Sequence, residues 1–195
     1  WLLIHSVYRL RQQGIENIPE EGAAVLVCNH VSFVDPIVIA AASRRPIRFV
    51  MDHRIYRTPL IRFVFHHMHA IPIAPAREDA AMMEAAFEQV AEALEAGELV
   101  AIFPEGKITD TGELHPFRPG VQRIVGRTPV PVIPMALQGL WGSFFSRKDG
   151  PAMSRPLRRG LFSKIALVVG SPVLPELATP EHLQAIVAGL RGDWR

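Results

Sequence analysis

Two residues able to do acid–base chemistry lie close together in the segment Asn29-His30-Val31-Ser32-Phe33-Val34-Asp35-Pro36. A histidine five residues before an aspartate can fold back so that the carboxylate accepts a bond from one ring nitrogen, which leaves the other nitrogen free as a base. This is the histidine and aspartate part of a catalytic triad, with a hydroxyl of the substrate in place of the serine. The segment predicts His30 and Asp35 as catalytic residues, with Asn29 and Ser32 supporting them.

A structural interpretation of the same segment is also open. Ser32 and Asp35 have the spacing of a capping box, and Asp35-Pro36 has the form of a cap followed by proline at the first helical position. Capping and catalysis do not exclude each other. A metal site needs more ligands than this segment offers, and the chain has no H-x-x-x-H or C-x-x-C spacing, so we expect no metal.

A second polar segment, Phe103-Pro104-Glu105-Gly106-Lys107-Ile108-Thr109, directly follows an apolar run. Gly106 would let backbone amides approach an anion, while Lys107 and Thr109 add a charge and a hydroxyl donor, and phosphate fits this combination. A carboxylate is out of place beside a phosphate, so we expect Glu105 to orient a base or to hold the loop through backbone hydrogen bonds. Taken alone, the segment is equally compatible with an ordinary strand-to-turn transition.

The two segments together resemble the family of glycerol-3-phosphate and 1-acylglycerol-3-phosphate acyltransferases, which pairs Asn-His-x-Ser-x-x-Asp with Phe-Pro-Glu-Gly. Weaker similarity lies in Ala70-Ile71-Pro72-Ile73, followed here by Arg77, and in Val130-Pro131-Val132-Ile133-Pro134. The resemblance implies that His30, oriented by Asp35, deprotonates a glycerol hydroxyl that attacks the thioester of an acyl carrier. It also implies that the reaction needs no metal or organic cofactor. The substrate-binding residues that it implies are Phe103, Pro104, Glu105, Gly106, Lys107, Thr109 and Arg77.

Two departures from the family pattern concern the acceptor's phosphate. The family commonly continues Phe-Pro-Glu-Gly with Thr-Arg-Ser, whereas this chain has Lys107-Ile108-Thr109, and lysine gives charge without the bidentate fork of arginine. In addition, Ala74-Pro75-Ala76 separates the second block from Arg77.

The run from Phe103 to Gly112 looks closer to the acyltransferase domain of bacterial lysophosphatidylethanolamine-recycling enzymes, which depend on acyl carrier protein and are often fusion proteins. Lysophosphatidylethanolamine therefore rivals 1-acylglycerol-3-phosphate as acceptor, and both acyl carrier protein and coenzyme A stay open as carriers. Because the chain starts at Trp1 without methionine, we expect it to be part of a longer fusion chain.

The elements around these segments predict an α/β fold: a central mixed, largely parallel sheet flanked by helices, in a single domain of the glycerolipid acyltransferase type. A helix-compatible pattern covers residues 1–10. Strands are expected at residues 23–28, 47–51, 70–73, 99–103, 130–137 and 165–169, and helices at 37–42, 57–67, 79–96 and 180–190. We divide the domain into a lead-in with the N-terminal helix (1–22), an acyltransferase core (23–140), and a C-terminal strand and helix that complete it (141–195).

Composition restricts the partners. Hydrophobic residues make up 49% of the 195 positions, yet no apolar run approaches the roughly 18 residues that span a bilayer. A net charge of +2 is too mild to indicate nucleic acid. There are two basic stretches, at residues 44–73 and 147–164. They would suit the cytoplasmic face of a membrane, to which the protein would attach peripherally or through a tether elsewhere in a longer protein. Alternatively, both stretches are simply solvated surface.

Two other functions stay open at this point. One is a non-catalytic membrane-binding module that uses the basic stretches, and the other is a lipid or thioester hydrolase in which His30 and Asp35 activate water. A G-x-S-x-G nucleophile elbow is absent, which argues against a serine hydrolase. Cys28, the single cysteine, excludes an internal disulfide and is expected to fill the core.

Overall fold

One seven-stranded sheet organises the computed structural model, which describes residues 8–57, 63, 66–143, 145–148 and 163–194. Its strands are β1 (Tyr8–Gln13), β2 (Ala24–Cys28), β3 (Ile47–Asp52), β4 (Ile71–Ile73), β5 (Leu99–Ile102), β6 (Val132–Gln138) and β7 (Ser163–Val169). They lie in the order β1-β7-β6-β2-β5-β3-β4, and all neighbours are parallel except β6 and β7. The mixed, largely parallel sheet predicted from the sequence is confirmed.

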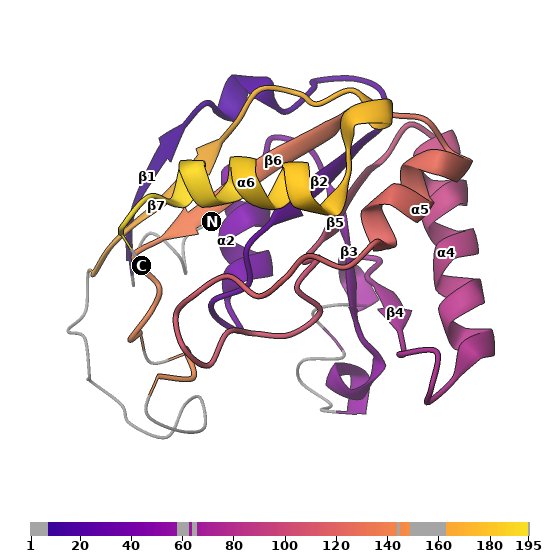
Figure 1. Ribbon diagram of the computed structural model, residues 1–195, viewed down its shortest axis with the longest axis horizontal. Coiled ribbons are helices and arrows are strands. Elements are labelled where there is room, and N and C mark those ends of the chain that lie inside the picture. Colours follow the sequence, from indigo (N-terminus) through magenta and orange to yellow (C-terminus); the bar gives the residue numbers. More distant parts are fainter. Residues whose placement is uncertain (1–7, 58–62, 64–65, 144, 149–162, 195) are drawn as a thin grey trace.

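Helices cover both faces of the sheet. They are α2 (Asp35–Ala42), α4 (Ala80–Glu95), α5 (Gly120–Arg127) and α6 (Pro180–Arg191), with short 3-10 helices η1 (Ile15–Asn17), η2 (His53–Arg57) and η3 (Pro175–Leu177). One apolar cluster joins α2 to one face, and a second joins α4, α5 and α6 to the other. Figure 1 shows α6 lying along the sheet beside β6 and β2, with α4 and α5 next to each other towards the β4 edge.

The central strand β2 explains why the apolar run at its position is continuous. Leu26 and Cys28 contribute to the cluster on the α2 face, whereas Val25 and Val27 contribute to the cluster on the opposite face. Every residue of β2 is buried, as is typical of a parallel strand covered by helices on both sides. The strand therefore delivers the polar residues that follow it to a fixed place at the edge of the sheet.

The helix boundaries follow local signals that are visible in the sequence. Asp79 caps α4 by accepting a hydrogen bond from the Met82 N–H at 2.8 Å, and Thr179 caps α6 in the same way through the His182 N–H. Gly97 follows α4 with a positive φ of 78°, and Pro36 lies in the first turn of α2. The helices predicted at residues 37–42, 79–96 and 180–190 are confirmed.

The predicted N-terminal helix is wrong from Tyr8 onward, where the chain forms β1 and pairs with β7; residues 1–7 of that prediction lie outside the described part. Leu10 is half-buried between exposed Arg9 and Arg11, so this segment alternates with the period of a strand. Pairing with a distant strand decides its conformation, and the apolar residues before it suggested a helical period.

One further helix differs from expectation, and another lies mostly outside the described residues. Helix α5 lies where only a loop was expected after Phe103, although Val121, Ile124 and Val125 are buried with helical spacing. The helix expected at residues 57–67 falls mostly outside the described residues; η2 ends at Arg57, and the described residues Phe63, His66 and His67 are helical. Among the helices that the structure describes, none has both the length and the apolar character needed to cross a bilayer.

Candidate active site

His30 and Asp35 form a hydrogen-bonded pair in the loop between β2 and α2. The His30 Nδ1 lies 2.8 Å from Asp35 Oδ2, and the same oxygen accepts the N–H groups of Val31 (2.7 Å) and Ser32 (2.9 Å). Because a carboxylate only accepts, Nδ1 carries the proton of a neutral ring and Nε2 keeps its lone pair. The Asp35 carboxyl is fully buried, whereas the His30 side chain is 17% exposed, so the base can be reached from outside.

The capping interpretation of this loop is realised only in part. Asp35 is the first residue of α2, and no side chain caps that helix; the residue before it, Val34, donates its N–H to the Ser32 hydroxyl at 3.4 Å. Three donors of this loop converge on one carboxylate oxygen of Asp35: the His30 ring and two backbone N–H groups. Asp35 therefore fixes the His30 ring and the backbone of the two residues that follow it.

The His30 ring stacks on Phe103, which follows β5. Their ring centroids are 4.1 Å apart with an interplanar angle of 17°, and Phe49 of β3 stacks behind Phe103 at 6.5 Å. Since β2, β3 and β5 are parallel, their carboxyl ends reach the same edge of the sheet, where α/β folds place their sites. Stacking on Phe103 fixes the plane of the His30 ring, and the hydrogen bond to Asp35 fixes its rotation within that plane.

Glu105 joins the two predicted polar segments. One carboxylate oxygen accepts the His30 N–H at 2.7 Å and the other accepts the His115 N–H at 2.7 Å, while the Thr109 N–H donates to the His30 carbonyl at 2.9 Å. These are backbone hydrogen bonds of the kind expected for Glu105. Burial raises the pKa of this carboxyl, and the two backbone N–H groups act in the opposite direction.

The other predicted residues of the Phe103 loop differ in their exposure to solvent. Gly106 and Lys107 are exposed, and Gly106 has a φ of +69°, a conformation that favours glycine. Thr109 is buried, and its hydroxyl donates to the Glu113 carbonyl at 2.7 Å and accepts the Gly112 N–H at 3.0 Å. Pro104 is also buried. The Thr109 hydroxyl thus braces the loop, and its contact with an acceptor stays a prediction.

Asn29 anchors the catalytic loop to the neighbouring strand. Its amide donates to the Leu137 carbonyl at 3.1 Å and accepts the Leu137 N–H at 2.8 Å, so it acts as an extra rung between β2 and β6. Ser32 is buried and forms an isolated bridge with Ser146. Burial strongly raises the pKa of the Cys28 thiol, which fits a neutral core residue and not a nucleophile.

Arg77 stands apart from these contacts. It is exposed in the turn after β4, and its side chain has no hydrogen bond or ion pair to a described residue. Its neighbour Glu78 pairs with Arg54. Within the described residues, no group of His, Cys, Asp and Glu side chains is arranged to hold a metal ion.

Two residues that the sequence analysis did not single out belong to this region. His115 supplies a backbone N–H to Glu105, and Arg118 donates its own N–H to the Pro104 carbonyl at 3.0 Å. The Arg118 guanidinium lies against Gly106, where a Cβ would come within 2.8 Å of its Cζ atom. Position in the same loop was the only available signal, because no spacing rule pairs Arg118 with Gly106.

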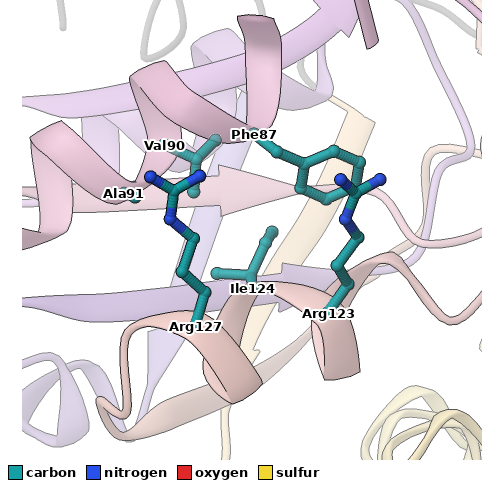
Figure 2. A pocket seen from close by; sticks show the side chains of 6 residues that line it. All are labelled: Phe87, Val90, Ala91, Arg123, Ile124 and Arg127. Carbon is teal, nitrogen blue, oxygen red and sulfur yellow. The ribbon is translucent and has the colours of Figure 1, made fainter. Parts of the chain in front are cut away.

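A small hollow between α4 and α5 is a weaker candidate. Figure 2 shows its lining residues, with Phe87, Val90 and Ala91 on α4 opposite Arg123, Ile124 and Arg127 on α5. The Arg123 guanidinium lies 4.0 Å above the Phe87 ring, and the two arginines pair with Glu84 and Glu88. None of the six lining residues is a base or a nucleophile, so the hollow offers no chemistry comparable to that of His30.

Known proteins resemble this chain in sequence and in fold. A chloroplastic 1-acyl-sn-glycerol-3-phosphate acyltransferase of Brassica napus is 31% identical over 137 residues, which cover 70% of this chain and 39% of the relative. A 1-acyl-sn-glycerol-3-phosphate acyltransferase of Bacillus subtilis is 26% identical over 181 residues, 90% of this chain and 81% of the relative. The chain thus spans well under half the length of the Brassica napus protein.

The fold itself has a solved counterpart. The crystal structure of the 1-acyl-sn-glycerophosphate acyltransferase PlsC from Thermotoga maritima superposes with a TM-score of 0.69 and 22% identity, covering 94% of this chain and 69% of the other. The family model described as Acyltransferase matches residues 9–138, which include the His30 loop and the Glu105 loop. Since that match extends over most of the sequence, the chain belongs to the acyltransferase family.

Proposed function

We propose that this chain transfers a fatty acyl group from a thioester carrier to the free hydroxyl of a lysophospholipid. The observation that carries the proposal is the His30 Nδ1 to Asp35 Oδ2 bond of 2.8 Å, which leaves Nε2 free on a side chain that is 17% exposed. The names of the relatives favour 1-acylglycerol-3-phosphate as acceptor. Lysophosphatidylethanolamine is the second acceptor to test, because of the Phe103–Gly112 resemblance.

The reaction follows from the free Nε2 atom. As the glycerol oxygen attacks the thioester carbonyl, its proton passes to Nε2 and the Asp35 carboxylate stabilises the imidazolium that forms. When the tetrahedral intermediate collapses, the carbon–sulfur bond breaks and the thiolate takes the proton from His30. The net result is one ester formed and one thiol released, and no step uses a metal or an organic cofactor. The carrier is acyl carrier protein or coenzyme A.

The proposed location is the cytoplasmic face of a membrane, because the acceptor and the product are both lipids. The basic stretch at residues 44–73 carries less free charge than its composition implies. Its arginines Arg44, Arg48 and Arg54 pair with acidic residues, and Arg45 donates to backbone carbonyls. Attachment is therefore proposed to involve other surfaces or other parts of a longer protein.

Transfer of labelled acyl groups tests the proposal directly. Acyl carrier protein and coenzyme A thioesters are each paired with 1-acylglycerol-3-phosphate and with lysophosphatidylethanolamine, for the wild type, His30→Ala and Asp35→Asn. Loss of a general base typically costs about 100- to 10,000-fold in rate, so both variants are expected to lose at least about 100-fold. His182→Ala, an exposed histidine on α6, is the matched control and keeps full activity.

The outcomes separate the rival functions. Full transfer by a folded His30→Ala protein would exclude the proposed mechanism, and no transfer by the wild type with any pair would favour a membrane-binding module. Release of free fatty acid in place of a new ester would identify a hydrolase. The preferred donor and acceptor are read from the same set of reactions.

A further inference from the structure

Arg118 is held beside the catalytic loop by its own backbone. Its N–H donates to the Pro104 carbonyl at 3.0 Å, and the preceding N–H, of buried Phe117, donates to the Gln184 side chain at 2.9 Å. The guanidinium lies over Gly106, because a Cβ at that glycine would be 2.8 Å from the Cζ atom and 3.0 Å from Nη1. Hydrogen bonds of two successive N–H groups therefore fix the backbone at Arg118, and the contact with Gly106 gives the position of its guanidinium.

The positive charge of Arg118 has no carboxylate partner within the described part of the chain. Arg123 and Arg127, on the helix that follows it, are paired with Glu84 and Glu88. Glu105, the acid next to Gly106 in the sequence, has both oxygens occupied by backbone N–H groups. An exposed, oriented and unpaired guanidinium is suited to bind an anion that arrives with a ligand.

The proposed acceptor carries such an anion close to its reactive hydroxyl. In 1-acylglycerol-3-phosphate the phosphate is on the carbon next to the one that bears the free hydroxyl. A group that binds the phosphate must therefore lie near the base. Gly106 directly follows Glu105, and Glu105 binds the His30 N–H at 2.7 Å, so the guanidinium over Gly106 satisfies this requirement.

From these contacts we infer that Arg118 binds the acceptor's phosphate and supplies the guanidinium that the chain lacks at Ile108. The inference rests on the proposed function for the identity of the ligand. The Ile108 side chain is buried in the protein, with 7% exposure, so that position presents no group to a ligand. A guanidinium returning from the far end of the same loop restores the planar, bidentate recognition that Lys107 cannot give.

The other predicted phosphate ligands are less suited to this role. The Thr109 hydroxyl is committed to the Glu113 carbonyl at 2.7 Å. Arg77 lies in the turn after β4, and no hydrogen bond or ion pair links it to the Phe103 loop in the described structure. Lys107 is exposed in the loop and is the rival that an experiment has to separate from Arg118.

Binding measured without an acyl donor tests the inference separately from catalysis. Isothermal titration uses a short-chain 1-acylglycerol-3-phosphate below its micelle concentration, with the corresponding 1-acylglycerol as the ligand that lacks phosphate. Loss of a charged hydrogen-bonding group corresponds to about tenfold or more, so Arg118→Ala should weaken phosphate-ligand binding at least tenfold. Arg118→Lys should recover part of it, and binding of 1-acylglycerol should not change.

Controls distinguish a local contact from general electrostatics. Arg11→Ala removes an exposed arginine of β1, at the opposite edge of the sheet from β4, and should leave the affinity unchanged. Lys107→Ala tests the rival, and a larger loss there than in Arg118→Ala would overturn the inference. Equal affinity of the wild type and Arg118→Ala, or no binding by the wild type, would overturn it as well.

A double-mutant cycle adds a measurement that depends on the contact over Gly106. A methyl group at position 106 must displace the guanidinium, so Gly106→Ala and Arg118→Ala should be non-additive in their effects on phosphate-ligand affinity. Additive losses would contradict the inferred contact. If the wild type transferred no acyl group to any acceptor while these binding differences held, the proposed function would fail and the phosphate site would stand.

Discussion

The side chain of Asn29 adds a pair of hydrogen bonds between two central strands, just after the end of β2. It bonds both the N–H and the carbonyl of Leu137 in β6, and it is buried, with 1% exposure. A buried backbone group that loses its partner costs about 1–3 kcal/mol. Asn29 therefore contributes to stability as well as to the position of the next residue, His30.

For Asn29→Ala we expect the free energy of unfolding to fall by about 1–3 kcal/mol, because alanine leaves both Leu137 groups without these bonds. Urea denaturation followed by circular dichroism measures this change. Acyl transfer should fall as well, since the backbone of the base is released. An unchanged midpoint and slope would mean that water or another group replaces the amide without cost.

The raised pKa of Glu105 predicts a pH dependence with a definite sign. A carboxyl whose pKa is higher in the folded chain than its ordinary value of 4.5 binds more protons when folded, so its contribution to stability is complete below that value. The contribution is then lost as the pH rises through the folded pKa. Urea denaturation of the wild type and of Glu105→Gln between pH 4 and 8 checks this. The free energy of unfolding of the wild type, relative to that of the variant, should decrease as the pH rises above about 4.5.

At this scale the sequence predicts contacts that are close along the chain. His30 and Asp35 could be paired because a short loop connects them, and the hydrogen bonds of Glu105 could be anticipated because a carboxylate suits backbone donors. The partners Leu137, His115 and Arg118 could not be found, because folding alone brings them to their sites. The roles of Thr109 and Arg77 in acceptor binding stay predictions.

Between elements, Arg45 connects three segments of chain. Its guanidinium donates to the Pro19 and Gly22 carbonyls at 2.9 and 2.8 Å, before β2, and to the Gly97 carbonyl at 2.7 Å, between α4 and β5. The residue counts as part of a basic stretch in the sequence, but in the fold its charge is used to satisfy turn carbonyls. These turns set where β2 and β5 begin.

Replacing Arg45 by alanine should lower the free energy of unfolding by about 1–3 kcal/mol, because three carbonyls lose a charged donor. Its neighbour Arg44 is the matched control. Arg44 pairs with Glu20 where both side chains are more than 80% exposed (81% and 82%), so Arg44→Ala should change stability by less than about 1 kcal/mol. Equal effects in the two variants, measured by urea denaturation, would contradict the role assigned to Arg45.

Elements with local signals were predictable, and those without were not. Asp79 and Gly97 mark both ends of α4, and continuous apolar residues mark β2 and β5. Helix α5 has glycines at positions 120 and 126, which weaken its propensity and obscure its apolar spacing. Strand β1 depends on pairing with β7, which lies at the other end of the chain, and no local pattern encodes that partner.

At the scale of the molecule, the last quarter of the chain completes the sheet and its helix layer. Strand β7 pairs with both β6 and β1, and the Leu183 and Val187 side chains of α6 are fully buried in one of the two apolar clusters. Strand order and the reversed direction of β7 could not be derived from sequence patterns, because they depend on contacts between distant segments. The division at residue 140 stays a prediction about organisation.

A chain that ends at residue 140 should not unfold cooperatively. It lacks β7, which covers the β6 edge, and α6, which buries Leu183 and Val187 against the sheet. Thermal unfolding followed by near-ultraviolet circular dichroism, with limited proteolysis of the same sample, checks this. A sharp transition in the truncated chain would show that the first part folds without its C-terminal completion.

The Phe103 loop is closed on itself at its base. The Arg118 N–H returns to the Pro104 carbonyl and the His115 N–H returns to Glu105, while Thr109 braces the turn between them. The bonds that hold His30 come from Glu105 and Thr109, whereas positions 106, 107 and 110 are exposed. Substitutions confined to these exposed positions can therefore change headgroup selectivity while the bonds that hold the base stay in place.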